Sequence, residues 1–429
     1  MRANTMRRTR IVILLASLVV LTFGSLRLCH LETQRRAIKE DVIELSKIKF
    51  GLFSVDEWRL IVANILTKKV EEFEFNGEQR EAMRIKISNF LIKIISDFEA
   101  RFHKEKASSL IGMVQGGIVS ITGAMEKVKK DVPVFTEQIL DFLAKEDNRN
   151  TVQSFMLDKL AEYTDKTFSK IDYTEHDLIL EHYKLGDRPA TITGLKVKMN
   201  LIRQEELQYL VLIFVFLAIV FFLLLYPSPT SNYEFVLFIL ISLVLLRAGL
   251  ILPMIEIDAR IENMSFTLFG EPVDFYDQVL YYKSKSILDI VQLMIYQPKW
   301  DIKIVGLLVL TFSVLFPLSK LFSSLLYIAY SRVRKHPIIR FMVFRTGKWS
   351  MADVMVVAIF MAYIGFSGIL TEQLNQLENL SASLDIVTTN KSSLQLGFYM
   401  FTSFVLLSLI VAHKLQYSNG KSTEEKVDS

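Results

Sequence analysis

Five long apolar runs in the second half of the chain constrain its fold more than any other sequence feature. A helix of about 20 apolar residues crosses a bilayer, and spanning segments must satisfy their own backbone hydrogen bonds. We therefore predict five transmembrane helices here. They cover about Tyr209 to Tyr226, Phe235 to Pro253, Ile304 to Ala329, Val354 to Leu370 and Leu394 to Ala412.

A sixth apolar run, from Ile11 to Leu26, follows a basic N-terminus that contains four arginines. This order is typical of a signal peptide or a signal anchor. No small-residue cleavage site precedes Cys29, so we favour an uncleaved anchor over residues 1–29. The predicted fold class is mainly α: a polytopic membrane protein of about six transmembrane helices, with an exported helical domain and a small extracytoplasmic β-sheet.

Composition narrows the functional classes. Hydrophobic residues make up 51% and charged residues 22% of the chain, which indicates a membrane part joined to a soluble part. The 50 basic and 46 acidic residues nearly balance, so nothing favours a nucleic-acid partner. Cys29 is the only cysteine, which excludes an internal disulfide and a cysteine-based zinc ribbon.

Residues 30–205 form the predicted exported domain, because they are charged, poor in Pro and Gly, and mostly periodic at helical spacing. The stretch from Tyr173 to Pro189 is predicted to be its exit loop. The metal-ligand types in that loop do not align on one helix face, and no H-E-x-x-H motif occurs, so we predict a solvated loop without a metal or cofactor. They are Glu175, His176, Asp177, Glu181 and His182.

Loop charges predict the orientation of the remaining module, residues 206–415. Tyr330 to Ser350 holds six basic residues and no acid, whereas Thr371 to Ser393 holds three acids and one lysine. The excess of positive charge in cytoplasmic loops places the first loop in the cytoplasm and the second outside. Both termini, including the tail 416–429, are then cytoplasmic, and residues 30–205 and 254–301 are outside.

The outer loop 254–301 begins with period-two alternation. Four apolar residues from Ile255 to Ile261 alternate with charged residues from Glu256 to Glu262, and the pattern shifts at Asn263 and Met264. Strict alternation is typical of a strand with one buried face. We therefore predict a half-buried strand or hairpin that contributes to a small sheet above the spans.

Three charged residues lie within or beside the apolar runs: Arg247, Lys320 and Asp353. Charge in hydrocarbon is costly unless it is paired, hydrated or able to reach the interface, and it commonly marks a transport path. Lys320 and Asp353 approach the same membrane face and are predicted to form an ion pair or hydrated pocket. Alternatively, both cations reach toward the membrane surfaces and Asp353 is only a favourable helix-start residue. Further hydrogen-bonding candidates are Ser350, Thr311, Ser313 and Ser319.

Several motifs along residues 208–415 resemble the paraquat-inducible protein A family. The likeness rests on four motifs. They are a proline at the outer end of one span, P-x-x-K in the next span, G-K-W-S-M-x-D-V before another span, and Gly397-x-Tyr399. These motifs contain Pro253, Pro317, Lys320, Gly347, Trp349, Ser350 and Asp353.

The resemblance implies a bacterial inner-membrane component that passes phospholipid between the bilayer and an extracytoplasmic partner with mammalian-cell-entry domains. The chain differs from the family pattern in having one module, no cysteine-rich ribbon and an additional exported domain. A non-transporting accessory protein and a stand-alone solute transporter are the alternatives. No nucleophile elbow, P-loop or H-E-x-x-H motif supports an enzyme.

Overall fold

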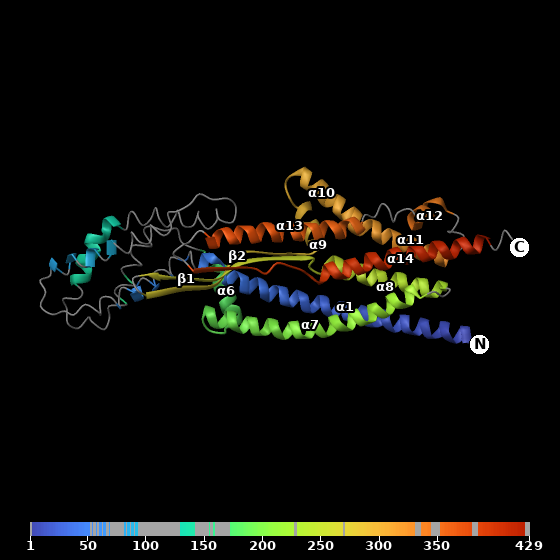
Figure 1. The fold of residues 1–429 in the computed structure, drawn as a ribbon, viewed down its shortest axis with the longest axis horizontal. Helices are drawn as coiled ribbons and strands as arrows, with labels where there is room; N and C mark the ends of the chain where they lie inside the picture. Colours follow the sequence, from blue (N-terminus) through green and yellow to red (C-terminus); the bar gives the residue numbers. More distant parts are fainter. Residues whose placement is uncertain are drawn as a thin grey trace.

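The computed structural model describes residues 2–51, 129–141, 172–226, 230–268, 271–330, 336–344, 352–379 and 385–424, with scattered positions between 54 and 92 and at 154 and 158. The molecule is an elongated helical bundle with a small sheet beyond one end, and both termini lie at the other end (Figure 1). In the described part, six helices have the length and apolarity of membrane spans. The predicted fold class is confirmed. The division into an exported domain and a membrane module stays a prediction.

The spans agree with the predicted runs, but several helices extend well beyond them. α7 begins 21 residues before Tyr209, where the Asp187 side chain accepts a hydrogen bond from the Ala190 amide and Pro189 lies in the first turn, a favourable helix start. Its polar half packs along α1. The spanning helices are α1 (Arg2–Leu45), α7 (Arg188–Leu225), α8 (Asn232–Ile251), α10 (Trp300–Leu310) continued by the π-helical η3 (Thr311–Leu315) and α11 (Phe316–Ala329), α13 (Ala352–Asn379) and α14 (Leu396–Glu424).

The predicted exit loop is partly wrong, because α6 (Thr174–Tyr183) occupies most of it. Its apolar side chains pack on a cluster formed by α1 and α7, so tertiary packing makes a helix of this polar stretch. His176 is 8% exposed and stacks near Phe50, with ring centroids 4.9 Å apart. The other short helices are η1 (Ile48–Phe50), α9 (Ile287–Ile295) and α12 (Pro337–Phe344).

The predicted hairpin is confirmed and belongs to an antiparallel sheet. β1 (Ile255–Leu268) pairs with β2 (Glu271–Lys285), and β3 (Asp385–Asn390) pairs with the other edge of β1. β4 (Ser393–Leu394) extends that edge. The alternation shifts because the register between β1 and β3 breaks between Ile261 and Asn263. The strands β3 and β4 come from the last outer loop, for which no strand was predicted.

Both faces of β1 are buried, so the predicted half-buried strand is wrong in this respect. On one face, Ala259 packs against Leu370 and Leu374 of α13. The alternate residues Asp258 and Arg260 are only 1% and 8% exposed. Ion pairs with neighbouring elements allow this charged face to be buried.

The core of the bundle lies where α8 meets α1 and α14, and the contact with α14 depends on two glycines. A Cβ at Gly397 would lie 2.2 Å from the Leu252 carbonyl oxygen, and one at Gly249 would lie 2.7 Å from the Phe401 backbone nitrogen. The Gly397 amide donates to the Pro253 carbonyl over 2.8 Å. Pro253 and Gly397 thus join the ends of two spans directly below the sheet.

Candidate functional site in the membrane bundle

A stripe of polar and small residues follows one face of the helix formed by α10, η3 and α11. Ser313, Pro317, Lys320 and Ser324 recur at spacings of four, three and four, and all four are buried. Such spacing keeps side chains on one side of a helix. α11 packs on α8 and α12, so the stripe faces the bundle and not the surrounding hydrocarbon.

The π-helical turn η3 sits at the head of this stripe. Pro317 has no N–H to donate to the carbonyl of Ser313, and the Phe316 amide instead donates to Thr311 five residues back. Single π-helical turns within α-helices are frequent at functional sites. The Ser313 hydroxyl is buried and has no hydrogen-bond partner within the part of the chain that the structure describes. Thr311 is half-buried, and its hydroxyl donates to the Leu307 carbonyl over 2.8 Å.

Lys320 lies one turn beyond Pro317 and is 5% exposed. The Ser324 hydroxyl donates to the Lys320 backbone carbonyl over 2.8 Å. Nine residues separate Lys320 from the end of α11, so its ammonium group belongs to a spanning segment. A lysine at such a depth is costly and usually faces a partner or a polar cavity.

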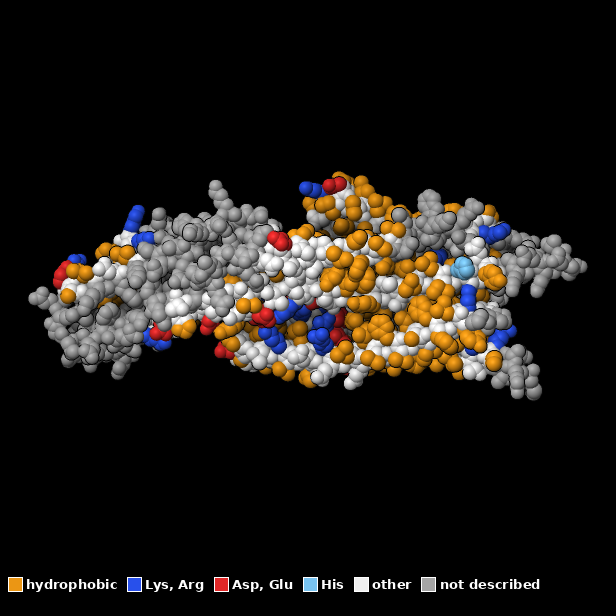
Figure 2. Space-filling view, viewed as in Figure 1, with side chains coloured by type: hydrophobic (Ala, Val, Ile, Leu, Met, Phe, Trp, Pro, Cys, Tyr) orange, Lys and Arg blue, Asp and Glu red, His pale blue; other side chains and the backbone are white. Residues whose placement is uncertain are grey.

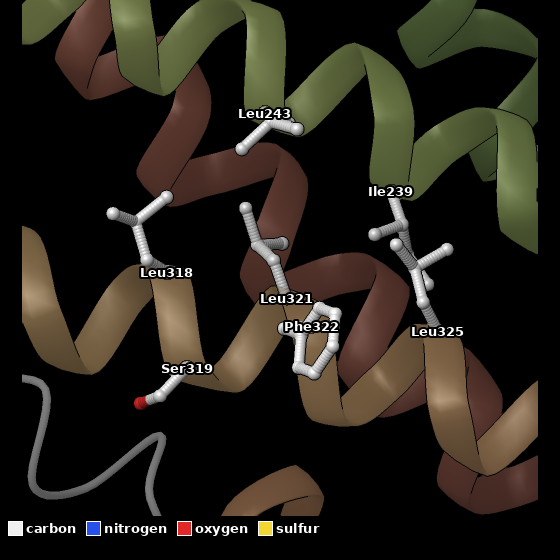
Figure 3. Close-up of a pocket in the computed structure, with 7 residues that line it drawn as sticks. All are labelled: Ile239, Leu243, Leu318, Ser319, Leu321, Phe322 and Leu325. Carbon is white, nitrogen blue, oxygen red and sulfur yellow. The ribbon is translucent and has the colours of Figure 1, made fainter.

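An apolar groove of about 410 Å³ runs between α8 and α11 (Figure 3), and Lys320 is not among its lining residues. Ser319, its one polar lining residue, turns its hydroxyl to the Phe316 carbonyl over 2.9 Å, which leaves an apolar wall. Ser319 and Leu321 are the chain neighbours of Lys320. The lining residues are Ile239, Leu243, Leu318, Ser319, Leu321, Phe322 and Leu325.

Arg247 continues the α8 wall of the groove toward the end of α8 that leads into the sheet. It follows Ile239 and Leu243 at four-residue spacing, which is the spacing of a ridge along one side of a helix. Exposure rises along this ridge, since Ile239 is buried, Leu243 is 38% exposed and Arg247 is exposed. The groove therefore has a cation one turn beyond its lining residue Leu243, whereas the buried Lys320 belongs to the polar stripe of α11 and does not line the groove.

The remaining predicted site residues are not brought to this site by any described contact. Gly347, Trp349 and Ser350 lie outside the described residues. The backbone of Asp353 belongs to the first turn of α13, but its side chain is outside the described part. The predicted contact between Lys320 and Asp353 therefore stays a prediction.

A second group of buried charges, which the sequence did not single out, lies outside the spans. Charged side chains gather at the edge of the hydrophobic band that faces the sheet (Figure 2). Lys39 of α1 contacts Glu256 at 2.5 Å and Asp258 at 3.6 Å. Arg260 contacts Asp258 at 2.6 Å and Asp277 at 2.5 Å.

Asp277 also contacts Lys196 of α7 at 2.6 Å. Burial alone would raise the pKa of Asp277, but Lys196 and Arg260 outweigh burial and lower this pKa below its usual value. We name these six residues, Lys39, Lys196, Glu256, Asp258, Arg260 and Asp277, the outer ionic network. The sequence signal for this network was the series of charged residues that alternate with apolar residues along β1. When both faces of a strand are buried, such charged side chains need partners.

Comparison with known proteins gives one match. Residues 279–375 match the family model described as paraquat-inducible protein A, a region that runs from within β2 through α9 to α13. No curated protein and no solved structure matches the chain. The matched region is shorter than the resemblance over residues 208–415, but it includes η3, Pro317, Lys320 and the α11 wall of the groove. The chain is therefore a multi-pass membrane protein that contains a region similar to the paraquat-inducible protein A family.

Proposed function

We propose that this protein is an integral membrane subunit of an intermembrane lipid transport system, and that the groove between α8 and α11 binds a phospholipid acyl chain. One observation carries the proposal: an apolar groove on spanning helices has the exposed cation Arg247 one helical turn from its lining residue Leu243. An amphiphile with a hydrocarbon tail and an anionic head group matches both features.

The position of the groove supports a lipid over a water-soluble solute. Its walls belong to two helices with the apolarity of membrane spans, so hydrocarbon chains are the molecules that reach it. Its volume of about 410 Å³ is within the range of about 300–1,000 Å³ typical of ligand sites. Lys320 and Arg247 carry positive charge, and the phosphate of a phospholipid is a favourable partner for such groups.

The predicted orientation indicates which end of the bundle would meet a partner. The sheet and the outer ionic network lie at the end of the bundle opposite the termini, which positive-inside logic assigns to the extracytoplasmic side of a bacterial inner membrane. We propose that this end meets a partner with mammalian-cell-entry domains. This partner class is what the resemblance to the paraquat-inducible protein A family implies, and the family match covers residues 279–375.

The proposal is tested by filling the groove. Leu318→Trp places an indole among the lining residues, whereas Leu308→Trp adds the same side chain at an exposed position of α10. Both variants and the wild type are purified in mild detergent, and the bound phospholipid is quantified by mass spectrometry. We expect Leu318→Trp to lose most of the bound lipid and Leu308→Trp to retain it.

Equal lipid content in all three proteins would contradict an acyl-chain site in the groove. If a stable protein partner also copurified unchanged, that result would favour the accessory function over lipid transport. A pair of charge variants addresses the head group in the same experiment. Lys320→Met should lower the anionic lipid content, whereas Lys303→Met, beside Trp300 at the start of the same helix, should not.

A further inference from the structure

Three buried ionisable side chains join α1 to α7 just outside the apolar part of the bundle. Arg35 contacts Glu32 of its own helix at 2.7 Å and Glu206 of α7 at 3.0 Å. The side chains of Arg35, Glu32 and Glu206 are 15%, 6% and 7% exposed. Glu206 lies three residues before Tyr209, where the apolar run of α7 begins.

The charges of this triad do not balance. Two carboxyl groups share one guanidinium, because Arg35 contacts both Glu32 and Glu206, and in addition to burial, Glu32 raises the pKa of Glu206 through its charge and a side-chain hydrogen bond. Two ionised carboxylates cannot form a hydrogen bond with each other, because both are acceptors only. Like charges in one poorly solvated site favour retention of a proton by one of them.

Among the described residues, no ion pair brings a second cation to the triad. From β1, Glu256 adds negative charge near Arg35, and Lys39 is already engaged by Glu256 and Asp258. Toward α8, Arg247 and Glu32 both act electrostatically on the Cys29 thiol, but no described ion pair joins Arg247 to the triad. The exposed pair of Arg27 and Glu205, at 2.8 Å, balances itself.

We propose that Glu32 and Glu206 together bind one proton against Arg35, forming a proton-binding site at the contact between α1 and α7. Burial is the main cause that raises the pKa of Glu206 to about 7, and Glu32 adds to it, while Arg35 acts in the opposite direction. The site thus changes its charge in the physiological pH range. The inference does not depend on the proposed lipid function.

The pH dependence follows from this shift. An unfolded glutamate ionises near pH 4.3, whereas the folded protein keeps the proton of Glu206 up to about pH 7. The folded state therefore binds more protons in this window, and stability falls as pH rises through it. Above about pH 7 the second carboxylate ionises and repels Glu32 across the contact between α1 and α7.

Infrared spectroscopy of the full-length protein in detergent tests the proposal, with Glu205→Gln as the matched control for Glu206→Gln. We expect a protonated-carboxyl band that disappears between about pH 6 and pH 8 in the wild type. Glu206→Gln should lack this band, and Glu205→Gln should retain it. The proposal would be overturned if the wild type and Glu206→Gln showed the same protonated-carboxyl absorption across this pH range.

Glu32→Gln provides a second arm that does not require the Glu206 variant to fold. Removing the neighbouring negative charge should shift disappearance of the Glu206 band to lower pH, because Arg35 then serves one carboxylate alone. An unchanged titration in Glu32→Gln would contradict a proton shared between the two carboxyl groups. Melting temperatures of the same proteins across the pH range should show wild-type stability falling with pH more steeply than that of Glu206→Gln.

Discussion

The outer ionic network and the α10–α11 stripe bury charge in two different ways. In the network, Lys39, Arg260 and Lys196 each contact a carboxylate of another element within 2.6 Å. In the stripe, Lys320 is buried in a spanning helix close to a π-helical turn. Side chains of the first kind hold elements together. The second region is the proposed lipid-binding region, so substitutions are expected to affect stability in the first region and lipid binding in the second.

The largest loss of stability is expected from Asp258→Ala, because it breaks a buried ion pair at the centre of the network. Asp258 is 1% exposed and contacts both Arg260 and Lys39. Removing one partner of a buried pair typically costs about 3–5 kcal/mol. Denaturant unfolding in detergent measures the loss, and Glu262→Ala, which breaks the exposed pair with Lys391, is the control. Equal effects of the two variants would remove the distinction between buried and surface charge.

The next largest effect is expected at the close contact between α8 and α14. Gly397→Ala brings a methyl group against the Leu252 carbonyl, and overpacking typically costs about 1–3 kcal/mol. Gly365→Ala is the matched control, because nothing lies within 4 Å of the added Cβ. It should be neutral or slightly stabilising, since alanine favours a helix. Thermal unfolding of both variants shows whether this contact is as tight as described; equal melting temperatures would contradict it.

A smaller effect is expected at the start of α9, where Ser286 and Asp289 form a capping box. Ser286→Ala loses the bond that the Asp289 amide donates to the Ser286 hydroxyl over 3.1 Å. Loss of such a cap typically costs about 1 kcal/mol. Asp289 also pairs with Arg36 of α1. The double variant of Ser286→Ala with Arg36→Met therefore measures the coupling between the cap and this ion pair. Strictly additive losses in unfolding free energy would show that the two contacts are independent.

The smallest effect on stability is expected at Lys320, although its effect on function should be large. Lys320→Met removes a charge from a spanning helix at similar side-chain length, which relieves a desolvation penalty. Unfolding experiments should show a smaller loss of stability than Asp258→Ala gives, while bound anionic lipid decreases. A destabilisation as large as that of Asp258→Ala would instead place Lys320 among the structural charges and end the comparison between the two regions.

The spans could be predicted from the sequence because long apolar runs require a helical, membrane-embedded solution. The hairpin could be predicted because alternation in β1 specifies a strand. The helix α6 and the strand β3 could not, because their stability comes from packing and pairing with elements distant in the chain. The burial of the second face of β1 could not be predicted for the same reason, since no local sequence pattern indicates that Lys39 of α1 pairs with carboxylates on this face.

The candidate site was predictable in its parts but not in its arrangement. Lys320, Arg247 and Ser313 stood out because they are polar residues in apolar runs. The groove could not be predicted, because Ile239 and Phe322 are ordinary apolar residues of spanning helices in the sequence. Only the packing of α8 beside α11 makes them lining residues of one groove. Glu32 and Glu206 were likewise ordinary helix charges in the sequence. Their separation of 174 positions hides a contact that only the pairing of α1 with α7 creates.

Photo-crosslinking with a phospholipid that carries a photoactivatable acyl chain tests the central claim most directly. The purified protein is reconstituted with this lipid, irradiated and digested, and the modified residues are identified by mass spectrometry. The account predicts adducts concentrated on Leu318, Ser319 and Phe322, well above the exposed span residue Leu308, and their loss in Leu318→Trp. Uniform labelling of lipid-exposed positions, unchanged in that variant, would contradict an acyl-chain site between α8 and α11.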